Sequence, residues 1–345
     1  MKKILISTIV DGNIGNRLQN YAMQKLFRDR GYDVKTVCFY PNNHIAKIKY
    51  YIRGVLYNAM PSLFDSIWRW DAFNFRYVKL GKNLEYYKNH PDAVDYYVVG
   101  SDQVWNPEWY SQERVDAFLL PFAQDSKKIA VSASFGISNF SGEWRDTFSK
   151  ELSSFKAISV REKDAVDIVK ELTGRDAELV IDPTMMLSAE DWKRVMSKPK
   201  IDGMNKKYIL TYFLGSITDA AQRRIDELVQ KYHFFVIDQS TYADLIGPGE
   251  FLYLLSHAQI VITDSFHGCV FSTIFEIPFL VYRRNNTVLD MFSRIDTLLD
   301  TLALHGRHDD ENKLRDVLKC DYSHAKQLIK NEQKKLNEFI NLALK

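Results

Sequence analysis

Short apolar stretches alternate with amphipathic segments of helical length through most of this sequence. In the first half the apolar stretches are 3–8, 33–39, 96–99, 128–132, 157–160 and 178–181, and amphipathic segments such as 17–30, 142–155 and 163–172 lie between several of them. Parallel neighbouring strands need a crossover of about helical length, so this alternation is typical of a parallel sheet covered by helices. We therefore expect a Rossmann-like, doubly wound α/β domain.

A second series of the same kind follows the polar loop at 198–206. Its strands are expected at 208–213, 234–237, 259–263 and 279–282, and its helices at 219–232, 249–258 and 267–275. The sequence thus predicts two Rossmann-like domains facing a cleft, over residues 1–190 and 191–320. The remaining residues, 321–345, are expected to form one amphipathic helix that packs against either domain.

The region at about 45–85 departs from this alternation, and its pattern predicts a helical insertion in the first domain. It is dense in basic and aromatic residues, the aromatic ones including Tyr50, Tyr51, Tyr57, Phe64, Trp68, Trp70, Phe73, Phe75 and Tyr77. Two interpretations stay open. The aromatic side chains form the core of the insertion, or they rest on a membrane surface, where basic and aromatic residues are favoured.

Charge and cysteine content exclude several classes of protein. The formal charge of +2 argues against a nucleic-acid partner. The three cysteines form no paired framework and no C-x-x-C motif, which is typical of proteins in a reducing compartment. No run of about 18 apolar residues occurs, so no membrane-spanning helix is expected. The prediction is a cytoplasmic protein, with peripheral contact at the inner face of a membrane left open by the 45–85 region.

Polar residues follow several of the predicted strands at the point where each strand ends. They are Asn16, Arg17, Ser101, Asp102, Gln103, Arg161 and Asp182 in the first domain, and Asp264, Ser265, His267 and Gly268 in the second. Ligands of open α/β sheets bind beyond the carboxyl ends of the strands, where helix N-termini offer free N–H groups. We therefore expect these residues to converge on one cleft and to bind substrate.

The chemistry of these residues suits a small anion. The guanidinium groups of Arg17 and Arg161 match a carboxylate or a phosphate, and the helix start at Ser265 favours negative charge. Asp102 is placed to act as a base or to orient a hydroxyl. No metal site is predicted, because H-x-x-x-H, cysteine clusters and D-x-D triplets are absent. The absence of G-x-S-x-G and P-loop patterns disfavours hydrolases and P-loop proteins.

Five motifs together resemble the polysaccharide pyruvyl transferase family, in that family's order and over roughly residues 12–282. They are GNRLQNYAMQ (15–24), GSDQVWN (100–106), SVREKDA (159–165), IDPT (181–184) and TDSFHG (263–268). The resemblance implies a GT-B-like pair of domains that transfers the enolpyruvyl group of phosphoenolpyruvate onto a sugar of a cell-surface polysaccharide precursor. The expected product is a cyclic pyruvate ketal, with release of phosphate and with no cofactor.

The resemblance also implies roles for individual residues. The family's functional positions map onto Asp102, Arg161 and His267, which we expect to be catalytic. The sugar acceptor, free or lipid-linked, is expected on the first domain and phosphoenolpyruvate on the second. Arg161 and the helix start after Ser265 are expected to hold the carboxylate and phosphate of the donor. Many relatives carry an arginine where this chain has Ser265, and the candidates to replace it are Arg17, Arg161, Arg283 and Arg284.

Two other classes of protein stay open. A nucleotide-sugar glycosyltransferase of the same architecture would use Glu276 to hold a ribose, although the Gly-rich loop and acidic pair that usually grip a diphosphate are absent. A glycan-binding module without catalysis would not need Asp, Arg and His residues contributed by both domains. Binding of phosphoenolpyruvate or of a nucleotide sugar separates these possibilities.

Overall fold

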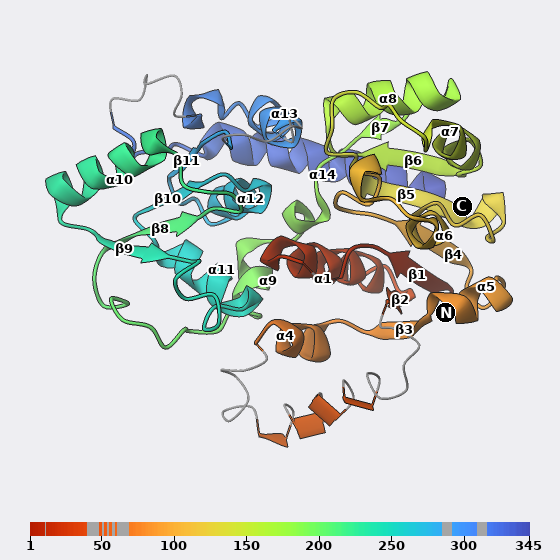
Figure 1. The fold of residues 1–345 in the computed structure, drawn as a ribbon, viewed down its shortest axis with the longest axis horizontal. Coiled ribbons are helices and arrows are strands. Elements are labelled where there is room, and N and C mark those ends of the chain that lie inside the picture. The colour runs from red at the N-terminus through yellow and green to blue at the C-terminus, as the bar shows by residue number, and fades with distance from the viewer. Residues whose placement is uncertain are drawn as a thin grey trace. The chain divides into compact units, whose positions relative to one another are not determined.

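The computed structural model describes residues 1–10, 12–39, 69–284, 292–308 and 316–345, together with 48–49, 52–53, 55–56 and 59–60. The chain divides into two compact units, which are shown in Figure 1. Unit 1 comprises Met1–Met186 and Asn331–Lys345, and unit 2 comprises Leu187–Lys330. The predicted acceptor and donor sides of these units stay a prediction.

Unit 1 is built on a parallel sheet. Within the described residues its strands are β1 (Lys3–Ser7), β2 (Asp33–Cys38), β3 (Leu80–Asn83), β4 (Tyr96–Val99), β5 (Lys128–Ala133), β6 (Ala157–Val160) and β7 (Glu178–Leu179). Their order across the sheet is β3-β2-β1-β4-β5-β6-β7, and every described pairing is parallel. The order reverses between β1 and β4, which is where a doubly wound sheet opens a crevice at its carboxyl edge.

Helices connect these strands. Within the described residues they include α1 (Ile14–Arg28), α4 (Arg69–Tyr77), α5 (Leu84–Asn89), α6 (Gln112–Phe118), α7 (Arg145–Ser153) and α8 (Lys163–Thr173), with short 3₁₀ turns η1 (Pro107–Trp109), η2 (Asp125–Lys127) and η3 (Pro183–Met186). A reciprocal capping box between Asn13 and Asn16 fixes the start of α1 directly after β1. The first turn of α1 is thereby held at the crevice.

The predicted helical insertion is only partly described. Residues 40–47, 50–51, 54, 57–58 and 61–68, with Tyr50, Tyr51, Tyr57, Phe64 and Trp68, lie outside the described residues. Where the structure describes this region, Phe73 and Tyr77 of α4 pack on Tyr21 of α1, with each ring centroid 5.9 Å from that of Tyr21. The insertion also ends earlier than expected, because β3 pairs with β2 as an edge strand of the sheet.

Unit 2 contains a smaller parallel sheet. Among the described residues its strands are β8 (Tyr208–Tyr212), β9 (Phe235–Asp238), β10 (Ile260–Thr263) and β11 (Phe279–Val281), in the order β11-β10-β8-β9. Its described helical elements include α9 (Ala189–Lys193), α10 (Asp219–Tyr232), α11 (Pro248–His257), α12 (Phe266–Ile274), α13 (Ser293–Thr301) and η4 (His305–Arg307). The strand order reverses between β8 and β10, so this sheet has a crevice position of its own.

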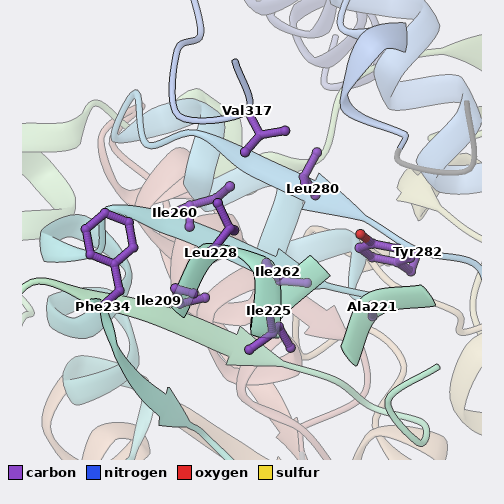
Figure 2. Close-up of a cluster of buried hydrophobic side chains, with 10 residues drawn as sticks. All are labelled: Ile209, Ala221, Ile225, Leu228, Phe234, Ile260, Ile262, Leu280, Tyr282 and Val317. Atoms are coloured by element: carbon purple, nitrogen blue, oxygen red, sulfur yellow. The ribbon is translucent and has the colours of Figure 1, made fainter. Parts of the chain in front are cut away.

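Both faces of the smaller sheet are covered. Figure 2 shows the cluster on one face, where Ile225 and Leu228 of α10 pack against Ile209 of β8 and neighbouring strand residues. Side chains alternate between the faces of a strand. On the other face, Tyr212 packs on Phe251 of α11 with ring centroids 4.7 Å apart. This burial of both faces explains the continuous apolar runs that predicted the strands.

The C-terminal helix α14 (Ser323–Ala343) belongs in part to each unit. In unit 2, Lys326 forms an ion pair of 3.0 Å with Glu276. In unit 1, Gln333 donates a 2.7 Å hydrogen bond to the carbonyl of Met185. None of the helices in the described parts of the chain has the length and apolar character needed to cross a membrane.

Candidate functional site

Asp102 is the centre of a polar cluster in unit 1, directly after β4. Its Oδ1 atom accepts hydrogen bonds from Arg161 Nη2 at 2.8 Å and from the Gln103 backbone N–H at 2.9 Å. Its Oδ2 atom accepts a hydrogen bond from the amide of Asn16, which follows β1. The backbone of Asp102 has φ 77°, a left-handed conformation that costs a non-glycine residue free energy and that often occurs at functional sites. The structure thus holds this carboxylate firmly between β1 and β4.

Arg161 carries a buried charge among three carboxyl groups. Its Nη1 atom lies 2.7 Å from Asp182 Oδ2, and its Nε atom lies 4.0 Å from Glu162 Oε2. Burial lowers the pKa of Arg161, but Asp102, Asp182 and Glu162 together raise it further, so the net shift is upward. The guanidinium therefore stays charged, and the carboxyl groups around it outnumber it.

Asp182, which lies between β7 and η3, is the second carboxyl group that holds Arg161. Its Oδ1 atom accepts hydrogen bonds from the backbone N–H and the hydroxyl of Thr184, at 3.0 and 2.7 Å. The Ser101 hydroxyl lies 3.2 Å from Asp182 Oδ2 and 2.9 Å from Gln19 Oε1 of α1. These contacts orient Arg161 and the loop after β4, so we interpret Asp182 and Ser101 as residues that position the cluster.

Arg17 makes different contacts from the rest of the predicted set. Its Nε atom donates a 3.1 Å hydrogen bond to the Trp70 carbonyl, and its guanidinium lies 5.0 Å from the centroid of the Trp70 ring. These contacts join α1 to α4. A ligand-binding role for Arg17 stays a prediction.

Asp264 organises the crevice of unit 2, directly after β10. It accepts hydrogen bonds from the backbone N–H groups of Leu214 and Gly215, at 2.7 and 2.9 Å, in the loop that follows β8. Its Oδ2 atom also accepts a 2.7 Å hydrogen bond from Arg284 Nε. Asp264 thus ties together the residues that follow β8, β10 and β11.

The start of α12 lies beside Asp264. Ser265 is the N-cap, with its hydroxyl accepting a hydrogen bond from the Gly268 N–H at 3.4 Å. The N–H groups of the first helical turn have no partner within the helix, and the helix dipole makes this end positive. A Cβ atom at residue 268 would lie 2.6 Å from Thr263 Oγ1, so a glycine is needed for the helix to begin so close to β10. His267 is buried in this first turn, with its ring against Phe266.

Two arginine side chains, Arg284 and Arg294, contact residues at this helix start. Arg284 is held by Asp264 with a side chain that is 19% exposed, whereas Arg283 is exposed and pairs with Asp296 at 2.8 Å. Arg294 of α13 is buried, and its guanidinium lies 5.9 Å from the centroid of the Phe266 ring. Of the two adjacent arginines predicted to bind substrate, Arg284 is therefore the one that belongs to the crevice.

Sequence reasoning missed Glu162 and Arg294. The carboxylate of Glu162 accepts hydrogen bonds from the Phe135 and Gly136 backbone N–H groups, at 2.8 and 3.1 Å, and fixes the loop after β5. Glu162 stands inside a motif that drew attention only for its neighbour Arg161, so the signal was present. Arg294 follows a stretch with no motif, and only the folded position of α13 shows its relation to α12. No group of three or more potential metal ligands occurs among the residues that the structure describes.

The fold of the chain is similar to that of proteins with solved structures. The S. aureus MnaA–UDP co-structure matches with a TM-score of 0.50 and 12% identity, covering 98% of this chain and 97% of that one. UDP-GlcNAc 2-epimerase from Neisseria meningitidis bound to UDP-GlcNAc gives a TM-score of 0.49 and 13% identity, covering 99% and 100%. These identities are too low to indicate more than the fold. The predicted α/β fold with two Rossmann-like units of the GT-B kind is confirmed.

Sequence comparison is more specific than the comparison of folds. No curated protein matches the chain. A family model, polysaccharide pyruvyl transferase, matches residues 13–286, which is more than half of the chain and includes Asp102, Arg161, Asp182, Asp264 and His267. The resemblance expected from the five motifs is therefore confirmed: this chain belongs to the polysaccharide pyruvyl transferase family.

Proposed function

We propose that the protein transfers the enolpyruvyl group of phosphoenolpyruvate to a sugar and closes a cyclic pyruvate ketal. The observation that carries this proposal is the family match over residues 13–286, within which the left-handed, clamped carboxylate of Asp102 lies at a sheet crevice. A ketal-forming transfer needs a base for a hydroxyl and a positive site for a phosphorylated anion. The two clusters have the chemistry for these two tasks.

Unit 2 is proposed to hold phosphoenolpyruvate. The start of α12 offers backbone N–H groups and the positive end of a helix dipole, which favour a phosphate or a carboxylate. Arg284 adds a guanidinium that Asp264 orients through a 2.7 Å contact, and Arg294 adds a buried one next to Phe266. We assign to His267, in the first turn of the same helix, the task of assisting the departure of phosphate.

Unit 1 is proposed to hold the sugar. Asp102 accepts a proton from the attacking hydroxyl, and Arg161 and Asn16 keep the carboxylate oriented for this step. Because Arg161 is buried and engaged by Asp102 and Asp182, we assign it to holding Asp102 rather than the donor. Three carboxyl groups around one guanidinium favour a neutral hydroxyl over an anion at this place.

The proposed steps balance in atoms and charge. A general acid protonates the methylene carbon of phosphoenolpyruvate, and the first sugar hydroxyl adds to the resulting cationic C2 while losing its proton to Asp102. The bond between C2 and the phosphate oxygen then breaks, and the phosphate leaves with the electron pair. A second hydroxyl of the sugar adds to C2 and gives its proton to the conjugate base of the general acid, which closes the ketal and restores that acid. General acid–base help of this kind contributes about 10²–10⁴-fold per group.

The rival, a nucleotide-sugar glycosyltransferase, receives less support from the structure. Its predicted ribose ligand, Glu276, forms an ion pair of 3.0 Å with Lys326 of α14. That contact gives Glu276 a role in the packing of the C-terminal helix. The glycosyltransferase is therefore the alternative that the following experiment tests.

The test is a calorimetric titration with phosphoenolpyruvate, UDP-glucose and GDP-mannose, repeated on His267→Ala. The proposal expects saturable binding of phosphoenolpyruvate that weakens in the variant. Binding of a nucleotide sugar without binding of phosphoenolpyruvate would overturn the chemistry and support the glycosyltransferase. Thermal unfolding of the variant serves as the control for its folding.

A further inference from the structure

Among the buried polar side chains of unit 1 with an atom that lacks a hydrogen-bond partner in the described residues, three lie on the loops after β4 and β5. The atoms are Gln103 Nε2, Asn106 Nδ2 and Ser134 Oγ. All three residues are more than nine-tenths buried. A buried donor without a partner costs free energy, so a bound water or a ligand is expected to supply the missing partner.

The three residues lie on two loops that are paired with each other. The Ser134 backbone N–H donates to the Asp102 carbonyl at 3.0 Å, and the Trp105 N–H donates to the Ser134 carbonyl at 3.1 Å. The rings of Trp105 and Phe135 pack with centroids 5.3 Å apart. Asp102 itself stands on the first of these loops, so the unpartnered atoms lie close in the chain to the proposed base.

Gly136 and Glu162 determine where the Gln103 amide lies. A Cβ atom at Gly136 would be 1.7 Å from Gln103 Nε2, so the amide rests directly against this glycine. Gly136 also has φ +67°, which a side chain disfavours. Glu162 fixes the same segment by accepting the Gly136 N–H at 3.1 Å. Both residues therefore act as positioning residues for Gln103.

We propose that Gln103, Asn106 and Ser134 form a subsite for a neutral, hydroxyl-bearing ring, the sugar acceptor. Two amide donors and a hydroxyl match the oxygens of sugar hydroxyls. The excess of carboxyl groups around Arg161 opposes an anion in the same crevice. This inference rests on the proposed function, because it says where the sugar of that reaction binds. A buried water is the other occupant that such atoms take, and the experiment decides between the two.

The experiment measures binding of free galactose, glucose, N-acetylglucosamine and N-acetylmannosamine by saturation-transfer NMR. The variants are Gln103→Met, which removes the donor at similar length, Asn106→Ser, which keeps the N-cap of η1 that Asn106 supplies, and Gly136→Ala. The matched control is Gly174→Ala, because Gly174 has a similar φ of +71° but open space where its Cβ would lie. The two alanine variants thus share the backbone strain and differ in displacing Gln103.

The inference expects at least one sugar to bind the wild type, with a Kd about tenfold higher in Gln103→Met and Gly136→Ala. Gly174→Ala should bind the sugar as the wild type does. Absence of binding by every sugar, or equal binding by Gly136→Ala and Gly174→Ala, overturns the inference and leaves a buried water as the occupant.

A parallel titration with phosphoenolpyruvate separates this inference from the proposed function. Binding of phosphoenolpyruvate without any sugar binding contradicts the subsite alone. Sugar binding that follows the expected pattern, without binding of phosphoenolpyruvate, supports the subsite and contradicts the proposed donor.

Discussion

The polar clusters of the two units occupy equivalent places in their sheets but have opposite character. Each lies at the carboxyl edge where the strand order reverses, between β1 and β4 in unit 1 and between β8 and β10 in unit 2. In unit 1, Asp102, Glu162 and Asp182 surround one arginine. In unit 2, Asp264 orients Arg284 beside the positive start of α12. The strand order determines where each crevice lies, and the charges of its residues determine which kind of ligand we expect there.

The largest expected effect comes from removing the base in unit 1. Asp102→Asn keeps the size of the side chain but loses the proton acceptor, so turnover should fall about 10²–10⁴-fold. Affinity for phosphoenolpyruvate should stay within about twofold, because the donor is assigned to unit 2. Steady-state phosphate release and calorimetry measure the two quantities, and Asp176→Asn, at an exposed position, is the control. If Asp102→Asn weakened phosphoenolpyruvate binding as strongly as it lowered turnover, the assignment of the donor to unit 2 would be contradicted.

The next effect is on stability. Arg161→Met leaves three buried carboxyl groups without their cation, and breaking a buried ion pair in this way typically costs about 3–5 kcal/mol. Urea denaturation, monitored by amide hydrogen exchange in β4 and β6, measures the loss in the free energy of unfolding. Arg284→Met, at a partly exposed position, should lower stability less. If Arg161→Met and Arg284→Met lowered the free energy of unfolding equally, the buried ion pairs of Arg161 would not be the stronger ones.

Donor affinity distinguishes the two adjacent arginines of unit 2. Arg284→Met removes a charged hydrogen-bond donor from the crevice, and such bonds contribute about 1.5–3 kcal/mol, so the Kd for phosphoenolpyruvate should rise about 10- to 150-fold. Arg283→Met is the matched control, since Arg283 is exposed and paired with Asp296. The reverse ranking in calorimetry would move the anion site to Arg283.

The smallest effect concerns pH. Burial, with a contribution from Asp264, raises the pKa of Cys269 on α12 well above its ordinary value of 9.0. The folded state keeps this proton while the unfolded chain loses it, so stability present below pH 9 falls as the pH rises. Between pH 8 and pH 10 the loss from Cys269 is about 1.4 kcal/mol, and Cys269→Ala should remove this contribution while that of Cys320, whose pKa burial also raises, remains. Thermal unfolding from pH 8 to pH 10 measures how stability changes with pH, and Cys38→Ala is the control. If Cys269→Ala showed the same change of stability with pH as the wild type, the Cys269 thiol would not be shielded from solvent.

Regular elements with strong patterns could be predicted from the sequence. The strands Tyr96–Val99 and Ala157–Val160 and the helix Asp219–Tyr232 have the bounds that their patterns indicate. By contrast, Leu80–Asn83 has the sequence LGKN, which lacks β-branched residues, and it is a strand only because β2 offers an open edge. Short helices such as α6 and α13 likewise depend on tertiary packing more than on their own pattern.

In the candidate site too, some features could be predicted from the sequence and others could not. The ends of strands mark Asp102, Asp182 and Asp264 as rim residues, because parallel strands share one edge. Partners cannot be predicted from position alone: Arg17 contacts Trp70, whereas Asn16, its neighbour on α1, contacts Asp102. The role of Gly136 depends on the position of Gln103 Nε2, which lies 1.7 Å from where a Cβ atom of residue 136 would be, and only the folded structure shows this. Sequence therefore indicates which loops matter, and the structure indicates which side chains in them face each other.

Hydrogen exchange with and without phosphoenolpyruvate tests the central claim most directly. The account predicts that the donor alone protects the backbone at 214–215 and 265–268 in unit 2 and leaves 100–106 and 133–137 in unit 1 unchanged. UDP-glucose at the same concentration should protect neither. Protection by phosphoenolpyruvate that begins in the Asp102 loop, or no protection in either unit, would contradict the proposed division between an anion-binding and a sugar-binding crevice.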